Sequence, residues 1–185
     1  MVNILELKGD IWSYEDYLEL PSDGKTYQII GGELHMVPAP GTYHQKVSRN
    51  LGFILWDYVK KINWGEVYYA PTDVVFSSTD IVQPDIIGIS KDRLGIVKEK
   101  GIFGTPDLVI EIISSTTRAI DTKLKKVLYE RYGAKEYLLV YPEEKKLEVY
   151  LLRQGRYTLR GVYLKDQEIE LVSIPGLIID LKEVF

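Results

Sequence analysis

Two apolar runs in the middle of the chain each enclose a carboxylate, and they constrain the fold more than any other feature. The first run, VQPDIIGIS, carries Asp85, and the second run, PDLVIEII, carries Glu111. Both runs are apolar at successive positions, which is typical of central strands covered on both faces. Burial of an unpaired charge is costly, so such carboxylates are normally paired or bound to a metal. The sequence therefore predicts a polar site built on a buried sheet.

A basic segment, AIDTKLKKVLYERY, follows the second run and has the spacing of an amphipathic helix. The apolar positions expected to face the core are Ile120, Leu124, Val127 and Leu128. Asp121, Lys125 and Tyr129 recur every four residues, and we expect them along the edge of this stripe. Lys123 and Lys126 fall on the opposite side and are expected in solvent.

Elsewhere the periodicity predicts an α/β fold of the α+β kind, with a mixed central sheet flanked by helices. An apolar stripe predicts a helix over 42–62, with Thr42 and Gln45 as a capping box, and a short helix is expected over 13–20. A Gly-Gly turn predicts a hairpin over 26–37. Further strands are expected over 66–69, 73–76, 82–89, 107–113, 136–141, 147–152 and 157–162.

Length and composition narrow the class of protein. We expect residues 1–185 to form a single domain, with an N-terminal helix and hairpin and a C-terminal β-meander extension. The absence of cysteine excludes disulfides, thiolate metal ligands and cysteine nucleophiles. The start, MVNILELKGD, lacks a signal-peptide pattern, and no apolar run is long enough to cross a membrane, so we expect a cytoplasmic protein. The net charge of −4 disfavours a generally basic nucleic-acid binder but allows a local basic patch.

Asp85 and Glu111 have the chemistry of a divalent-metal site. Mg²⁺ prefers carboxylate and water oxygens, and it can activate a water and neutralise charge on a phosphate. Two carboxylates on neighbouring strands can share one ion if they emerge on the same side of the sheet. The alternative is that each carboxylate pairs with a basic residue or lies at a strand end.

Four other residues are candidates with competing interpretations. Glu33 follows the Gly-Gly turn and either lies beside these strands or is a surface residue of the hairpin. Lys125 either orients or deprotonates an attacking water, stabilises charge in the transition state, or is a solvated lysine. His44 begins the stripe of the long helix and either contacts phosphate, transfers a proton, or bonds a carbonyl at the core edge. Asp107 shares a face with Glu111, and we expect it to be structural.

Taken in order, the motifs resemble those of the Uma-type putative restriction endonucleases, a branch of the PD-(D/E)XK nuclease superfamily. The similar segments are YQIIGGELHMVPAPGTYHQKV, VQPDIIGIS, PDLVIEIISSTT and DTKLKKVLYERYGAKEYLLVYPEEKKLEVY. The resemblance covers nearly the whole chain, and it is specific as an ordered run although the Pro-Asp dipeptide alone is not. It implies a restriction-endonuclease-like PD-(D/E)XK core. It also implies Asp85 and Glu111 as metal ligands and Glu33 as an additional acidic ligand.

The chain departs from the superfamily pattern at one position. That pattern has a lysine two residues after the acidic strand residue, where this chain has Ile113. The resemblance to the Uma branch places the lysine on the following helix. There Lys125 fits a D-x-x-x-K-x-x-x-Y pattern together with Asp121 and Tyr129. The resemblance therefore implies Lys125 as a catalytic residue.

We expect an endonuclease that hydrolyses DNA with Mg²⁺, or with Mn²⁺ in its place, and in which His44, Asp121 and Tyr129 support the site. One alternative is a catalytically silent module that binds nucleic acid or protein on the same fold. Another is a hydrolase that uses the carboxylate pair without metal. Cutting a duplex needs two active sites, so we expect a homodimer, with Tyr-rich strands and the C-terminal segment IPGLIIDL at its interface.

Overall fold

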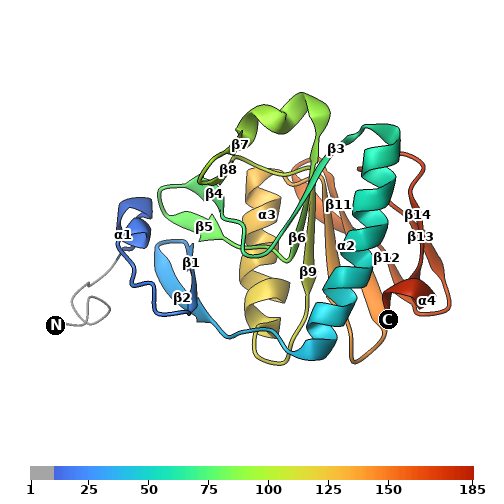
Figure 1. Ribbon diagram of the computed structural model, residues 1–185, viewed down its shortest axis with the longest axis horizontal. Helices are drawn as coiled ribbons and strands as arrows, with labels where there is room; N and C mark the ends of the chain where they lie inside the picture. Colours follow the sequence, from blue (N-terminus) through green and yellow to red (C-terminus); the bar gives the residue numbers. More distant parts are fainter. Residues whose placement is uncertain (1–10) are drawn as a thin grey trace.

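The computed structural model describes residues 11–185, which form two six-stranded sheets, a short two-stranded sheet and helices against them (Figure 1). The expectation that the N-terminal segment carries no signal peptide falls on residues 1–10, which lie outside the described residues. No helix in the described part of the chain is long and apolar enough to span a membrane.

The central sheet has the strand order β12-β11-β10-β9-β6-β3. Its strands are β3 (Gly65–Tyr69), β6 (Ile86–Ser90), β9 (Leu108–Ile112), β10 (Glu136–Tyr141), β11 (Lys146–Arg153) and β12 (Arg156–Leu164). Strands β9 and β10 are parallel, and every other neighbouring pair is antiparallel. All residues of β9 and β10 are buried, which confirms that these apolar runs are covered on both faces.

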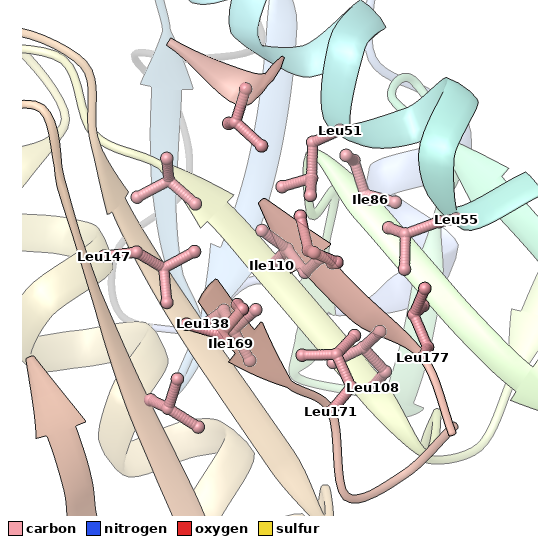
Figure 2. Close-up of a cluster of buried hydrophobic side chains, with 14 of the residues drawn as sticks. Leu51, Leu55, Ile86, Leu108, Ile110, Leu138, Leu147, Ile169, Leu171 and Leu177 are labelled. Carbon is pink, nitrogen blue, oxygen red and sulfur yellow. The ribbon is translucent and has the colours of Figure 1, made fainter. Parts of the chain in front are cut away.

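Helix α2 (Thr42–Ile62) covers one face of the central sheet, and its bounds agree with the predicted helix. Its apolar stripe packs against strands β6, β9 and β10 (Figure 2). The contacting side chains include Leu51, Leu55, Ile86, Leu108, Ile110 and Leu138. The predicted capping box at Thr42 is wrong: the N-cap residue is Gly41, and no described side chain caps the helix.

The C-terminal elements complete the same core. Strands β13 (Glu168–Glu170) and β14 (Ile178–Asp180) pair as a hairpin, and helix α4 (Leu181–Val184) follows. The fully buried carboxylate of Glu136 on β10 accepts hydrogen bonds from the N–H groups of Val172 and Ser173, which anchors this extension. Ile174, Leu177, Ile179 and Leu181 of IPGLIIDL are buried in the chain's own core, whereas Pro175 and Ile178 are exposed, so only a small part of this segment is accessible to the predicted dimer interface.

The second sheet has the order β2-β1-β5-β4-β8-β7. Its strands are β1 (Thr26–Ile30), β2 (Glu33–Val37), β4 (Val74–Ser77), β5 (Asp80–Val82), β7 (Val97–Lys98) and β8 (Gly101–Phe103). Helix α1 (Tyr14–Leu18) begins with the capping box predicted at Ser13 and Asp16, and the 3-10 helix η2 (Lys91–Ile96) links the two sheets.

The predicted strand over 82–89 is wrong in one respect, because the structure divides it between the two sheets. Strand β5 ends at Val82 and pairs with β1 and β4, whereas β6 begins at Ile86 and pairs with β3 and β9. Pro84 lies in the break and has no N–H to donate to a ladder. The crossing between sheets therefore occurs at Gln83–Asp85, next to the first candidate carboxylate.

Candidate active site

The helical segment after β9 presents polar residues to the sheet together with part of its apolar stripe, because Leu128 is buried and Ile120 packs against the same core. It consists of a π-helix, η3 (Ile120–Lys125), followed by α3 (Lys126–Tyr132). Asp121, Lys125 and Tyr129 are buried, whereas Leu124 and Val127 are 43% and 57% exposed. The prediction that Leu124 and Val127 face the core is therefore wrong. The reason is electrostatic, because a buried carboxylate on β9 needs a cation beside it.

That carboxylate is Glu111, whose residue surface is only 2% exposed. The Lys125 ammonium donates to Glu111 Oε1 at 2.9 Å, and the Tyr129 hydroxyl donates to the same oxygen at 2.5 Å. Lys125 Nζ also lies 3.3 Å from Asp121 Oδ1, one helical turn earlier. The Tyr137 hydroxyl donates to the backbone carbonyl of Asp121 and holds the π-helix against the sheet. Glu111 and the three residues of the D-x-x-x-K-x-x-x-Y pattern, Asp121, Lys125 and Tyr129, thus form one buried cluster.

Burial changes the protonation chemistry of this cluster. Desolvation raises the pKa of Glu111 to about 8, although the Lys125 charge opposes that shift. Burial disfavours the ammonium of Lys125, but the carboxylates of Glu111, Asp121 and Asp85 outweigh it and raise the Lys125 pKa above its ordinary value. Lys125 is therefore a fixed cation at neutral pH, while Glu111 exchanges its proton close to neutrality.

Asp85 is joined to the strand that carries Glu111. Its Oδ2 accepts a hydrogen bond from the N–H of Ile112 at 2.6 Å. Strand β6 pairs with β9 as far as Ile86 opposite Ile110, and Asp85 and Glu111 are the next residues of the two chains; both line the same cavity, and the Asp85 charge contributes to the raised pKa of Glu111. Directly opposed residues of an antiparallel pair point to the same face and are the closest neighbours across the sheet. The structure thus brings together the two carboxylates singled out in the sequence.

His44 reaches the same place from the first turn of α2. Its Nε2 lies 3.3 Å from Asp85 Oδ2, and its Nδ1 is buried without a partner among the described residues. Burial opposes a charge on this imidazole, but contact with the Asp85 carboxylate outweighs it and raises the pKa of His44 above its ordinary value. A backbone hydrogen bond with Ile112 also raises the pKa of His44, so the interpretation of His44 as bonded to a carbonyl at the core edge stays open beside the other two.

A cavity of about 760 Å³ opens over these residues. Asp85, Glu111, Asp121 and Lys125 lie in its wall together with His44. The other walls come from the β1–β2 hairpin, residues 37–45 at the start of α2, the crossing at Gln83 and the loop 114–117. The volume falls within the range of about 300–1,000 Å³ typical of small-molecule sites.

Glu33 is not brought to this cavity. It lies at the turn end of β2 opposite Ile30, its side chain is 79% exposed, and its Oε2 lies 3.9 Å from His35 Nε2. The cavity is lined by the other end of the hairpin, where Thr26 pairs with Val37. Glu33 is therefore a surface residue of the hairpin, which was the alternative interpretation.

Two glutamines that line the cavity were not predicted as site residues from the sequence: Gln28 on β1 and Gln83 at the crossing. Gln28 is 2% exposed although its strand lies outside the central sheet. The available signal was a glutamine inside the apolar run TYQII, where an amide has no obvious partner. For Gln83 the signal was its place two residues before Asp85.

The carboxylate pair fits a hard divalent ion that keeps part of its water shell. Oδ1 of Asp85 and Oε2 of Glu111 receive no hydrogen bond from residues 11–185, so one oxygen of each carboxylate is available as a ligand. Mg²⁺ is commonly held by one or two carboxylates plus waters. The described residues contain no group of three or more His, Asp or Glu that could enclose a metal. A closed site made of protein ligands alone does not fit.

The mixed sheets flanked by helices define an α+β protein of the restriction-endonuclease-like fold. A putative nuclease belonging to DUF820 from Anabaena variabilis has the same fold, with a TM-score of 0.78 and 19% sequence identity over 94% of this chain and 97% of that one. The profile of the Uma2 family, described as putative restriction endonuclease, matches residues 14–182, so the chain belongs to this family. No curated protein matches the chain.

Proposed function

We propose that this protein is a nuclease that hydrolyses phosphodiester bonds of DNA internally and uses Mg²⁺, with Mn²⁺ able to replace it. The observation that carries the proposal is the joining of Asp85, Glu111 and Lys125 in one cavity. A carboxylate pair beside a buried lysine supplies both a cation site and a fixed positive charge. Membership of a family described as restriction endonucleases supports the same chemistry.

In this proposal Asp85 and Glu111 hold the ion. A bound Mg²⁺ would lower the pKa of a coordinated water and neutralise charge on the phosphate. The hydrogen bond from Ile112 N–H fixes Asp85, and those from Lys125 and Tyr129 fix Glu111, so the two ligands need little rearrangement. The exchangeable proton of Glu111 is the one that must leave when the carboxylate binds a cation.

Lys125 acts through its charge. Its raised pKa keeps it protonated at neutral pH, which favours stabilisation of the phosphate in the transition state over abstraction of a proton. His44 is the remaining group suited to proton transfer or to a phosphate contact, since its Nδ1 is buried and unpartnered and its pKa is raised. Asp121 and Tyr129 are positioning residues that orient Lys125 and Glu111.

The test is cleavage of supercoiled, linear and single-stranded DNA in Mg²⁺, in Mn²⁺ and in EDTA. Glu111→Gln keeps the shape of the side chain and should abolish cleavage. Glu143→Gln is the matched control, because Glu143 is an exposed acid at the rim of the same cavity, and it should retain activity. Absence of cleavage in every condition, by a folded protein, would favour the silent binding module. Cleavage that persists in EDTA would favour the metal-independent hydrolase.

The homodimer expected from the sequence is retained for a duplex substrate, since cutting both strands needs two sites. Most of IPGLIIDL is buried within the chain, so the interface is expected on the Tyr-rich strands and on exposed residues of this segment such as Ile178. Light scattering at high protein concentration tests it, and a monomer would remove this part of the proposal.

A further inference from the structure

Two glutamines in the cavity wall carry polar atoms that nothing in the fold explains. The amide oxygens of Gln28 and Gln83 are buried and have no hydrogen-bond partner among residues 11–185. Both residues line the cavity that contains the carboxylate pair. An unpaired buried polar group costs roughly 1–3 kcal/mol, so native proteins rarely keep one without a function.

The amide of Gln83 is held in one orientation by its neighbours. Its Nε2 donates to Asp73 Oδ1 at 2.7 Å and to the Tyr17 hydroxyl oxygen at 3.1 Å, and Tyr17 in turn donates to Asp73 at 2.7 Å. These bonds occupy the nitrogen side of the amide and leave the oxygen unsatisfied. The fold has therefore fixed an acceptor in the cavity wall.

Gln28 lies on β1. This strand pairs with β5, which ends at Val82, the residue before Gln83. It is 2% exposed, and its strand neighbours Tyr27 and Ile29 are buried apolar side chains. Its amide oxygen is used by none of the described residues. Its role is consequently directed at something that enters the cavity.

The ligand that suits these acceptors presents N–H donors and is attached to a phosphate. The ring N–H and exocyclic amino groups of a nucleobase have this chemistry, and glutamine is a common partner of base edges. In a duplex the Watson–Crick donors are already used. A phosphate that reaches Glu111, which is 2% exposed, must enter the hollow, and a base attached to it has to leave its stack.

We propose that the Gln28–Gln83 wall is a base subsite, so that the cavity takes an unpaired nucleotide of single-stranded DNA next to the phosphate that is cleaved. This inference rests on the proposed nuclease function and names its substrate class. The start of α2 agrees with it, because the first-turn N–H groups at Gly41–His44 lie at the cavity without a side-chain cap and are suited to an adjacent phosphate. One protomer is enough for such a substrate.

Binding tests the inference separately from cleavage. A fluorescein-labelled 12-nucleotide strand and the duplex made by annealing its complement are titrated with protein by fluorescence anisotropy, in EDTA and with Ca²⁺. We expect the single strand to bind at least tenfold more tightly. Gln28→Met nearly preserves volume and should weaken single-strand binding about tenfold, the usual scale for a good base contact. The same variant should raise the Tm, because it removes an unpaired buried amide.

Gln83→Met should weaken binding similarly, and its thermal unfolding reports the separate loss of the bonds to Asp73 and Tyr17. Gln45→Met is the matched control, because Gln45 lines the cavity but is exposed, and it should leave the preference for the single strand unchanged. Duplex binding as tight as single-strand binding would overturn the inference, and duplex cleavage would then still support the nuclease. Unchanged single-strand affinity in Gln28→Met would overturn it as well. Failure of both DNA forms to bind would overturn the inference and the proposed function together.

Discussion

His44 Nε2 and Asp85 Oδ2 lie 3.3 Å apart, and this contact joins the first turn of α2 to the crossing between the two sheets. The same Asp85 carboxylate accepts a hydrogen bond from the N–H of Ile112, so it links α2 to β9. A charged imidazole is stabilised by this carboxylate more than burial disfavours it.

The imidazole of His44 is therefore expected to titrate above its ordinary pKa of 6.5. NMR can follow it, because the chain has only two histidines and a His35→Asn variant assigns the signals. Asp85→Asn should lower the pKa of His44. The raised pKa contributes stability that is present below the ordinary value and is lost as pH rises through the folded-state pKa. An unchanged His44 titration in Asp85→Asn would contradict the contact.

Lys125→Ala is expected to reduce Mg²⁺-dependent cleavage by about 10²–10³-fold, because the variant loses a positioned charge. It should also destabilise the fold by about 3–5 kcal/mol, since Glu111 and Asp121 lose their buried partner. Urea unfolding measures the second effect.

Two comparisons separate catalysis from stability at Lys125. The triple variant Lys125→Met, Glu111→Gln, Asp121→Asn removes the lysine together with both buried carboxylates beside it, and it should recover much of the lost stability without recovering cleavage. Lys123→Ala removes an exposed lysine of the same helix and should alter DNA affinity only modestly. Lys126 is a poorer control, because its Nζ lies 3.5 Å from the centre of the Tyr150 ring. Equal loss of cleavage in Lys123→Ala and Lys125→Ala would mean that the helix acts only as a basic surface.

Mg²⁺ binding is expected to strengthen as pH rises toward 8, because Glu111 must lose its proton to bind a cation and its pKa is about 8. Calorimetry in two buffers of different ionisation enthalpy should show release of a proton on binding at pH 7. In Glu111→Gln both the binding and the proton release should be absent. The metal-free protein should become less stable as pH rises toward 8. The raised pKa of Glu111 means that the fold favours the protonated carboxyl, and this contribution is lost as the proton leaves. Binding that does not depend on pH between 6 and 9 would count against Glu111 as a ligand.

Asp107 is expected to contribute to stability rather than to chemistry. Its carboxylate accepts from Ser90 N–H at 2.9 Å, Arg93 at 2.9 Å and Lys135 at 2.6 Å. Burial opposes its charge, but these donors outweigh it and lower the pKa of Asp107 from 3.8 to about 2. Its stabilisation is therefore present above pH 4 and is lost as pH falls from about 4 to about 2.

Asp107→Ala should cost about 2 kcal/mol at pH 7 and flatten the acid side of the stability profile. Asp57→Ala serves as the control, because it removes only the exposed pair with Lys61 and should cost less than about 0.5 kcal/mol. Chemical denaturation between pH 2 and pH 7 measures both. An Asp107→Ala variant with unchanged acid sensitivity would show that other carboxylates dominate.

Local periodicity was enough to predict the central strands and the long helix. Runs apolar at both parities marked β9 and β10 as covered on both faces, and helix α2 has the predicted bounds. The carboxylate pair could be predicted because charges inside such runs need partners. The prediction of one continuous strand over 82–89 was wrong, because it ignored that Pro84 has no backbone N–H to donate.

The orientation of the helix after β9 could not be obtained from its own residues. Its apolar residues suggested one buried face, but Glu111 on the strand beneath selects the face that carries Lys125 and Tyr129. That choice depends on a contact between residues 14 positions apart. Gln28 could not be predicted as a site residue for a similar reason, because its position beside the cavity depends on contacts between strands that are distant in the sequence.

The π-helix at Ile120–Lys125 has a consequence for the comparison of relatives. A π-turn holds one residue more than an α-turn, and an α-helix rotates by about 100° per residue. Deleting one residue ahead of Asp121 would let the segment relax into an α-helix and turn Asp121 and Lys125 away from β9. A homologue could then retain every residue of the site in its sequence and still lack the site. The length of chain between Glu111 and Lys125 is therefore as diagnostic as the identity of either residue.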